Sequence, residues 1–224
     1  MIFSENGSVN GFKQFPVSYT LHHNNRETKH LAIMLPGSTY HTERPLFHYC
    51  TALYLQNNID VLHINYQYDA LHFEVHSSEE LRVAIQNDVQ AVVNAFVQEK
   101  NYHTFDLIGK SIGTIGLSFL TQQPLFKEAA FIWLTPLLKM DYVYQSLISS
   151  TQQGLLVMGD DDPNFHEARF LHASAKQNIS AICLEDGNCS LEHEGNVFAS
   201  IESIQAVMQA ISEFMHTHSE VAKW

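Results

Sequence analysis

The chain has 224 residues, 45% of them apolar, and its 24 acidic residues outnumber its 12 basic residues. This length suits one domain, or two at most, with a sizeable core. A net charge of −12 without a basic cluster argues against nucleic acid or an anionic membrane surface as a partner. Three cysteines at irregular spacing argue against a disulfide framework and are typical of a reducing compartment.

The N-terminus lacks the basic start and apolar core of a signal peptide. No apolar run approaches the roughly 18 residues that are needed to span a membrane. We therefore expect a cytoplasmic protein that does not insert into a membrane.

Strand-like and helix-like segments alternate along the chain. The expected strands, in chain order, cover 12–21, 30–35, 60–66, 102–108, 129–134, 154–158 and 180–184. The expected helices cover 45–57, a segment from Ser78 to Phe96 with Ser78 as its N-cap, 114–120 and 201–215. Apolar strands separated by helices predict one doubly wound α/β domain over 1–224, with a mostly parallel sheet and helices on both faces. Function is expected at the carboxyl ends of the strands.

The most informative segment is 109–113, Gly-Lys-Ser-Ile-Gly, between an expected strand and an expected helix. G-x-S-x-G in that place predicts a nucleophile elbow, in which the glycines permit a sharp turn and the hydroxyl of Ser111 is exposed. Backbone N–H groups at the helix N-terminus favour the negative charge that develops there. A phosphate loop would need a glycine five positions before Gly109, and that residue is Thr104. An incidental serine in a tight turn is the remaining alternative.

The order of serine, acid and base along the chain resembles that of the α/β-hydrolase superfamily, over about Phe12 to Met215. Within it, the chain is most similar to small bacterial hydrolases without a cap. The segments that carry this resemblance are 36–40 (Pro-Gly-Ser-Thr-Tyr), 109–113, 159–163 (Gly-Asp-Asp-Asp-Pro) and 187–192 (Gly-Asn-Cys-Ser-Leu-Glu). The resemblance implies a serine hydrolase of an ester or related acyl bond, with a small-molecule acyl substrate and no cofactor.

By the same resemblance, the loop that contains Gly37 supplies one donor of an oxyanion hole. The donors would be the backbone N–H of Ser38 or Thr39 and that of Ile112, with Tyr40 lining the pocket. Two such donors stabilise a tetrahedral oxyanion, and losing one typically costs about 3 kcal/mol. A plain turn after a strand is the alternative.

Three consecutive aspartates, Asp160, Asp161 and Asp162, follow the strand expected at 154–158. The superfamily often has Gly-x-x-Asp followed by a turn residue, which selects Asp162 as the acid and leaves Asp161 as the runner-up. A carboxylate here would fix the histidine tautomer and stabilise its imidazolium. The alternative for each aspartate is an acid at the start of a helix over 163–175, where acids are favoured.

The segment 189–192 departs from the superfamily pattern, because Cys189 takes the place of a histidine that is often followed by Ser-Leu-Glu. A thiol is a poor base for a serine, since it lacks two nitrogens to bridge the serine and the acid. His193 would share a face with Cys189 on a helical turn, so we assign the base to His193. The main alternative is a broken triad, in a protein that binds a small ligand without turnover. A nucleophilic Cys189 and a small buried cysteine near the pocket are further interpretations.

The sequence alone leaves three questions undecided: a metal site, the role of residues 66–68 and the apolar face of the last helix. Fourteen histidines invite a metal site, for instance with His72 and His76 four residues apart, but no H-E-x-x-H is present and we expect no metal. Residues 66–68 (Tyr-Gln-Tyr) follow a strand and either line a pocket or fill the core. An apolar face on the last helix suits either core packing or a homodimer.

Overall fold

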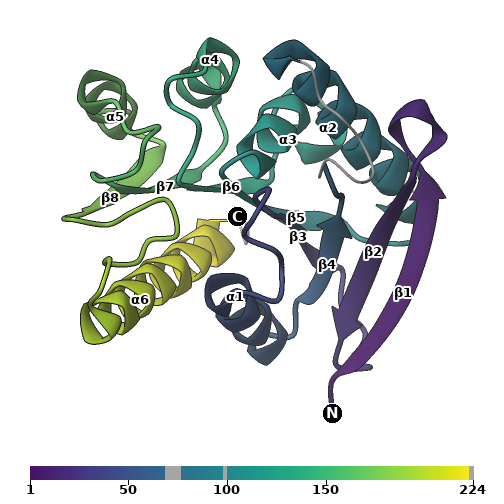
Figure 1. Ribbon diagram of the computed structural model, residues 1–224. Helices are drawn as coiled ribbons and strands as arrows, with labels where there is room; N and C mark the ends of the chain where they lie inside the picture. Colours follow the sequence, from purple (N-terminus) through teal and green to yellow (C-terminus); the bar gives the residue numbers. More distant parts are fainter. Residues whose placement is uncertain (69–76, 98–99, 222–224) are drawn as a thin grey trace.

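The computed structural model describes residues 1–68, 77–97 and 100–221. Within these ranges eight strands form one sheet in the order β1-β2-β4-β3-β5-β6-β7-β8 (Figure 1). β2 pairs antiparallel with both β1 and β4, and the strand pairs from β4 across to β8 are parallel. The strands are β1 (Phe3–Asn10), β2 (Pro16–His23), β3 (His30–Leu35), β4 (Asp60–Asn65), β5 (Thr104–Lys110), β6 (Ala130–Leu134), β7 (Gly154–Gly159) and β8 (Ile179–Leu184).

Helices cover both faces of the sheet, as the alternation of apolar strands and helices predicts. The helices are α1 (Pro45–Gln56), α2 (Ser78–Val92), α3 (Gly113–Leu120), α4 (Asp141–Ser149), α5 (Glu167–Ser174) and α6 (Val197–Val221). The described part of the chain also has three short helical turns, η1 (Phe12–Gln14), η2 (Val93–Val97) and η3 (Pro124–Phe126). In Figure 1, α1 and α6 lie on one face of the sheet and α2 to α5 on the other. The expected doubly wound α/β architecture is confirmed.

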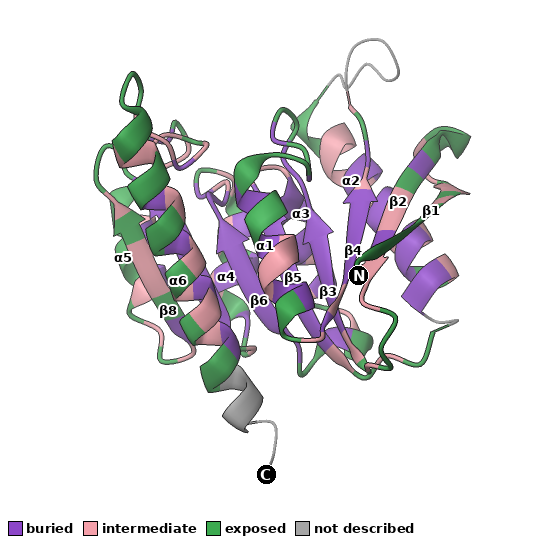
Figure 2. Cartoon of the chain, turned by 90° about the horizontal axis from the view of Figure 1, so that it is seen from below, coloured by how far each residue is buried: buried purple, intermediate pink, exposed green. Residues whose placement is uncertain are grey.

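The central strands are buried on both sides (Figure 2). Successive side chains of a strand point to opposite faces, so one strand supplies two cores. Leu31 and Ile33 of β3 pack in the core under α2 and α3, whereas Ala32 and Met34 pack in the core under α1 and α6. This explains why the strand sequences are apolar throughout instead of alternating.

The N-terminal part differs from the expectation of one strand over 12–21. Residues 12–14 form a helical turn, the strand begins at Pro16, and an unpredicted strand, β1, precedes it. β1 is an edge strand with six exposed and two half-buried residues, so its sequence carries no alternation of apolar and polar side chains. α4 is a further helix that the sequence analysis did not predict.

The N-cap of α2 is Ser77, not Ser78. The backbone of Ser77 is extended, with φ −154° and ψ 160°, and its hydroxyl accepts a hydrogen bond from the Glu80 N–H at 3.1 Å. Ser78 is the first residue of the helix itself, whereas an N-cap residue lies just outside the helix.

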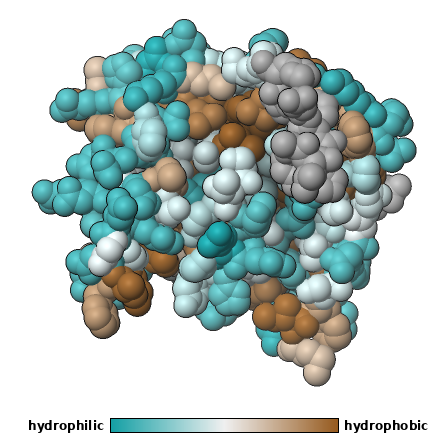
Figure 3. Space-filling view, in the orientation of Figure 1, coloured by the Kyte–Doolittle hydropathy of each residue, from teal (hydrophilic) through white to brown (hydrophobic). Residues whose placement is uncertain are grey.

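α6 begins four residues before the expected start. Its buried residues Val207, Ile211 and Met215 pack against the sheet, which accounts for part of its apolar face. Val197 and Phe198 at its start are 70% and 80% exposed, and apolar surface lies at the lower left of Figure 3, where Figure 1 draws α6. A homodimer stays a prediction. In the described part of the chain, no helix has the length and apolar character to cross a membrane.

Candidate active site

Ser111 lies in the turn that connects the carboxyl end of β5 to the N-terminus of α3. Its φ of 50° places a non-glycine residue in the left-handed region, which costs about 1 kcal/mol or more. The turn is held by hydrogen bonds on both sides. The Ser111 N–H donates to the Leu134 carbonyl at 3.0 Å, and the Ser111 carbonyl accepts from the Thr114 N–H at 3.0 Å and hydroxyl at 2.6 Å. Strained backbone that is fixed in this way is typical of functional sites.

The two glycines of the motif are required by close packing. A Cβ on Gly113 would lie 2.1 Å from the carbonyl oxygen of Leu35, at the end of β3. A Cβ on Gly109 would lie 2.6 Å from Cγ of Leu117 in the first turns of α3. The strand, the turn and the helix therefore approach more closely than any other residue type would allow.

The loop after β3 lies against Ser111. A Cβ on Gly37 would be 3.4 Å from the Cβ of Ser111, and the Gly37 N–H donates to the Tyr40 carbonyl at 3.2 Å. Ser38 and Thr39, which follow Gly37 in this loop, are exposed. Their backbone N–H groups as oxyanion donors stay a prediction.

Tyr40 is a core residue rather than a free pocket residue, with 7% of its surface exposed. Its hydroxyl accepts a hydrogen bond from the Leu46 N–H at 3.2 Å, at the start of α1. Burial raises the pKa of Tyr40 to about 12, so the phenol stays neutral.

Burial separates the three consecutive aspartates after β7. Asp160 and Asp161 are exposed, whereas Asp162 is 5% exposed and its Oδ1 accepts from the Asn164 N–H at 2.6 Å. Burial raises the pKa of Asp162, and the hydrogen bond from Asn164 and the charge of Lys110 oppose that rise. A Cβ on Gly159 would lie 2.0 Å from the Gly187 carbonyl, so the aspartate loop packs directly against the loop after β8.

The loop after β8 holds Cys189 and His193 in different surroundings. Cys189 is exposed, which corrects the interpretation of a small buried cysteine. His193 Nε2 lies 2.8 Å from the Ser203 hydroxyl of α6, and its backbone N–H donates to the Ser200 hydroxyl at 2.9 Å. Among the described residues, no hydrogen bond joins His193 to Ser111 or Asp162.

The sequence analysis missed the role of Lys110, whose side chain is fully buried at the carboxyl end of β5. Its Nζ donates to the Thr135 hydroxyl at 2.9 Å and to the Cys189 carbonyl, and lies 4.7 Å from the centre of the Tyr40 ring. Burial lowers the pKa of Lys110 to about 8, and the neighbouring Cys189, Asp162 and Glu192 oppose that fall. The sequence signal was a lysine at the end of an apolar strand.

The described residues contain no group of three or more His, Cys, Asp or Glu side chains that could hold a metal ion. His72 and His76 lie outside the part of the chain that the structure describes.

No protein-family model and no curated protein matches the sequence. Solved structures match nearly the whole chain. A protein of unknown function from Agrobacterium tumefaciens, described as a candidate α/β hydrolase, has a TM-score of 0.72 at 15% identity, over 96% of this chain and 97% of that chain. An esterase from Pyrococcus furiosus has a TM-score of 0.69 at 11% identity, over 96% and 93%. A protein from Xanthomonas campestris, described as a serine hydrolase without a lid, has 0.71 at 14%, over 96% and 94%.

At 11–15% identity these similarities establish the architecture and not the activity. The chain has the α/β-hydrolase fold, as the resemblance of its motifs predicts. Any activity has to be argued from the residues at the carboxyl edge of the sheet.

Proposed function

We propose that this protein is a serine hydrolase that cleaves an ester or a related acyl bond of a small molecule. The observation that carries the proposal is the backbone of Ser111, held at φ 50° between β5 and α3. A packing requirement alone would be met more cheaply by glycine at that position, because glycine adopts this conformation without strain. A serine kept there at a cost in stability supports a role for its hydroxyl.

In the proposed reaction, Ser111 Oγ attacks the acyl carbonyl and the backbone N–H groups of Ile112 and Ser38 hold the oxyanion. His193 takes the proton from the serine hydroxyl and gives it to the leaving group, and Asp162 orients the imidazole. A water molecule then attacks the acyl-serine, with His193 again as the base, and releases the acid. No cofactor enters these steps.

The contact between His193 and Ser203 sets a condition on this mechanism. The ring has to leave the Ser203 hydroxyl before Nε2 can come within about 3 Å of Ser111 Oγ. In structures without a substrate, catalytic hydrogen bonds are often long or poorly aligned and tighten only when the substrate binds. The proposal therefore includes a rearrangement of residues 187–196 when substrate binds.

The same contact favours a second candidate, a hydrolase-fold protein that binds a small ligand without turnover. A histidine that stays on Ser203 leaves Ser111 without a base, and Cys189 does not replace it. Fold alone does not decide between the two, because one scaffold hosts both kinds of protein.

The test is the rate of hydrolysis of p-nitrophenyl acetate and butyrate by the wild type, Ser111→Ala and His193→Ala. His166→Ala, which changes an exposed histidine at the start of α5, is the matched control. A wild-type rate lost in Ser111→Ala and His193→Ala but kept in His166→Ala supports the mechanism. A rate lost only in Ser111→Ala supports a serine hydrolase with another base.

A wild-type rate no higher than that of Ser111→Ala supports the second candidate. A fluorophosphonate probe gives an independent readout, because an activated serine reacts and Ser111→Ala does not. Labelling of the native protein no stronger than that of denatured protein would exclude an activated serine.

A further inference from the structure

A cavity of about 240 Å³ lies at the same edge of the sheet as Ser111. It is formed where β4 ends and β2 begins, and β4 runs parallel to β3, whose other neighbour is β5. One wall is made by residues 65–68 and another by residues 15–18. Residues 66–68 line this cavity, and Tyr66 is at the same time a core residue that is 5% exposed, so both interpretations of this segment hold.

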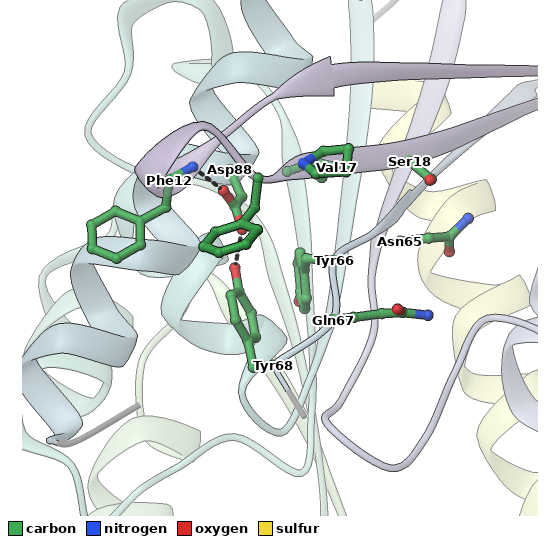
Figure 4. A pocket seen from close by; sticks show the side chains of 10 residues that line it. Phe12, Val17, Ser18, Asn65, Tyr66, Gln67, Tyr68 and Asp88 are labelled. Atoms are coloured by element: carbon green, nitrogen blue, oxygen red, sulfur yellow. Dashed lines mark hydrogen bonds between the residues drawn. The ribbon is translucent and has the colours of Figure 1, made fainter. Parts of the chain in front are cut away.

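Aromatic rings dominate this cavity (Figure 4). Phe12 and Phe15 come from the turn before β2, and Tyr66 and Tyr68 come from the segment after β4. The rings of Tyr66 and Tyr68 are stacked, with centres 5.2 Å apart and planes inclined by 27°. Phe15 is 46% exposed, so the cavity has an aromatic residue at the surface.

Among the described residues that line the cavity, Asp88 of α2 is the one carboxylate, and it is only 5% exposed. Its Oδ1 accepts from the Phe12 N–H and its Oδ2 accepts from the Tyr68 hydroxyl, both at 2.6 Å, as Figure 4 shows. Among the described residues no Lys, Arg or His side chain forms an ion pair with it. Burial raises the pKa of Asp88, because these two hydrogen bonds only partly replace the water it has lost.

We propose that this cavity binds a small organic cation, an amine or a quaternary ammonium group, with Asp88 as its counter-charge. Aromatic rings carry on their faces the negative potential that attracts such a cation, and four aromatic residues line this cavity. Each carboxylate oxygen of Asp88 retains lone pairs beyond the one hydrogen bond it accepts. The net charge of −12 adds a long-range attraction for a positive ligand.

The cavity is joined to the candidate active site through one hydrogen bond. The Tyr66 hydroxyl donates to the carbonyl of Pro36 at 2.7 Å, and Pro36 begins the loop that carries Ser38. A cation in this cavity would therefore lie one side chain away from the segment that leads into the proposed oxyanion loop. The binding proposal does not depend on hydrolysis, so Ser111→Ala should bind the same cation as the wild type.

The test is a calorimetric titration of the full chain with choline and with 3,3-dimethylbutan-1-ol. The two molecules have the same shape, but a neutral carbon replaces the ammonium nitrogen in the second. We expect choline to bind about tenfold more tightly, which corresponds to about 1.4 kcal/mol. Equal affinities, or no binding of choline, would overturn the proposal.

Asp88→Asn removes the charge and keeps an oxygen that can accept from the Phe12 N–H. We expect it to weaken choline binding about tenfold and to leave the binding of 3,3-dimethylbutan-1-ol unchanged. Asp60→Asn is the matched control, because Asp60 also accepts a tyrosine hydroxyl, that of Tyr102 at 2.7 Å, and does not line the cavity. Unchanged choline binding in Asp88→Asn would overturn the proposal.

Tyr68→Leu keeps the test valid if Asp88→Asn fails to fold. It leaves the carboxylate in place and removes one aromatic face, so choline should bind several-fold more weakly. Choline affinity equal to that of the wild type in Tyr68→Leu would contradict the aromatic part of the site.

Discussion

The buried ammonium group of Lys110 donates a hydrogen bond to the backbone carbonyl of Cys189, 79 residues further along the chain. This bond joins the end of β5, next to Ser111, to the loop after β8. A second bond from the same nitrogen to the Thr135 hydroxyl adds the loop after β6. Lys110 thus links three of the loops that surround the candidate active site.

The first prediction concerns how stability depends on pH. Burial lowers the pKa of Lys110 to about 8 in the folded protein, from its usual 10.5. Between these two values the folded state has released the proton while the unfolded chain still holds it, so this group makes the free energy of unfolding rise with pH. The shift corresponds to a rise of up to about 3 kcal/mol. Lys110→Met should remove this rise.

Urea unfolding of the wild type and Lys110→Met at several pH values between 7 and 10 measures the effect. As the pH rises from 7 to 10, the free energy of unfolding of the wild type should increase relative to that of Lys110→Met. Lys139→Met is the control, since Lys139 also donates to a backbone carbonyl, that of Pro163, but from an exposed position. Parallel pH dependences for the wild type and Lys110→Met would contradict the prediction.

The sequence predicted the strands β3 to β8 because each is an apolar run that stops at glycine, proline or a polar residue. It did not predict β1, which has no buried residue and is defined only by its pairing with β2. α4 was not predicted because its nine residues include only two buried apolar side chains, Val143 and Leu147, which are too few to show a helical period.

The local geometry was predictable where one short segment defines it, as in the turn between β5 and α3 that holds Ser111. It was not predictable where segments far apart in the sequence meet. The contacts of Lys110 with Cys189, and of His193 with Ser203, depend on tertiary packing that no spacing rule contains. The superfamily pattern selected Asp162 among the three aspartates, and the structure adds that Asp162 is buried while its two neighbours are exposed. Its role as the acid stays a prediction.

The second prediction concerns the strained backbone of Ser111. Ser111→Gly and Ser111→Ala both remove the hydroxyl, but only glycine relieves a φ of 50°. We expect Ser111→Gly to be more stable than Ser111→Ala by about 1 kcal/mol, from urea unfolding. Equal stabilities would mean that the turn does not strain the residue that occupies it.

The third prediction concerns the close approach of α3 to β3. Gly113→Ala places a Cβ 2.1 Å from a backbone oxygen of Leu35, which cannot move without displacing the strand. We expect a loss of about 3 kcal/mol in the free energy of unfolding, at the upper end for overpacking. Gly195→Ala is the control, because its Cβ meets nothing within 4 Å and only its φ of 71° opposes the change. A smaller loss in Gly113→Ala than in Gly195→Ala would contradict the packing argument.

The last prediction concerns the hydrogen bond that holds His193 away from Ser111. Ser203→Ala removes the partner of His193 Nε2 on α6, so the ring no longer loses that bond when it turns toward the serine. A hydrogen bond of about 1 kcal/mol corresponds to about a fivefold increase in the rate of p-nitrophenyl acetate hydrolysis. Ser146→Ala, which changes a buried serine of α4, should leave the rate unchanged. An unchanged or lower rate in Ser203→Ala would count against His193 as the base.

In that case Cys189→His, which restores the residue of the superfamily pattern, should raise the rate by about 10² or more.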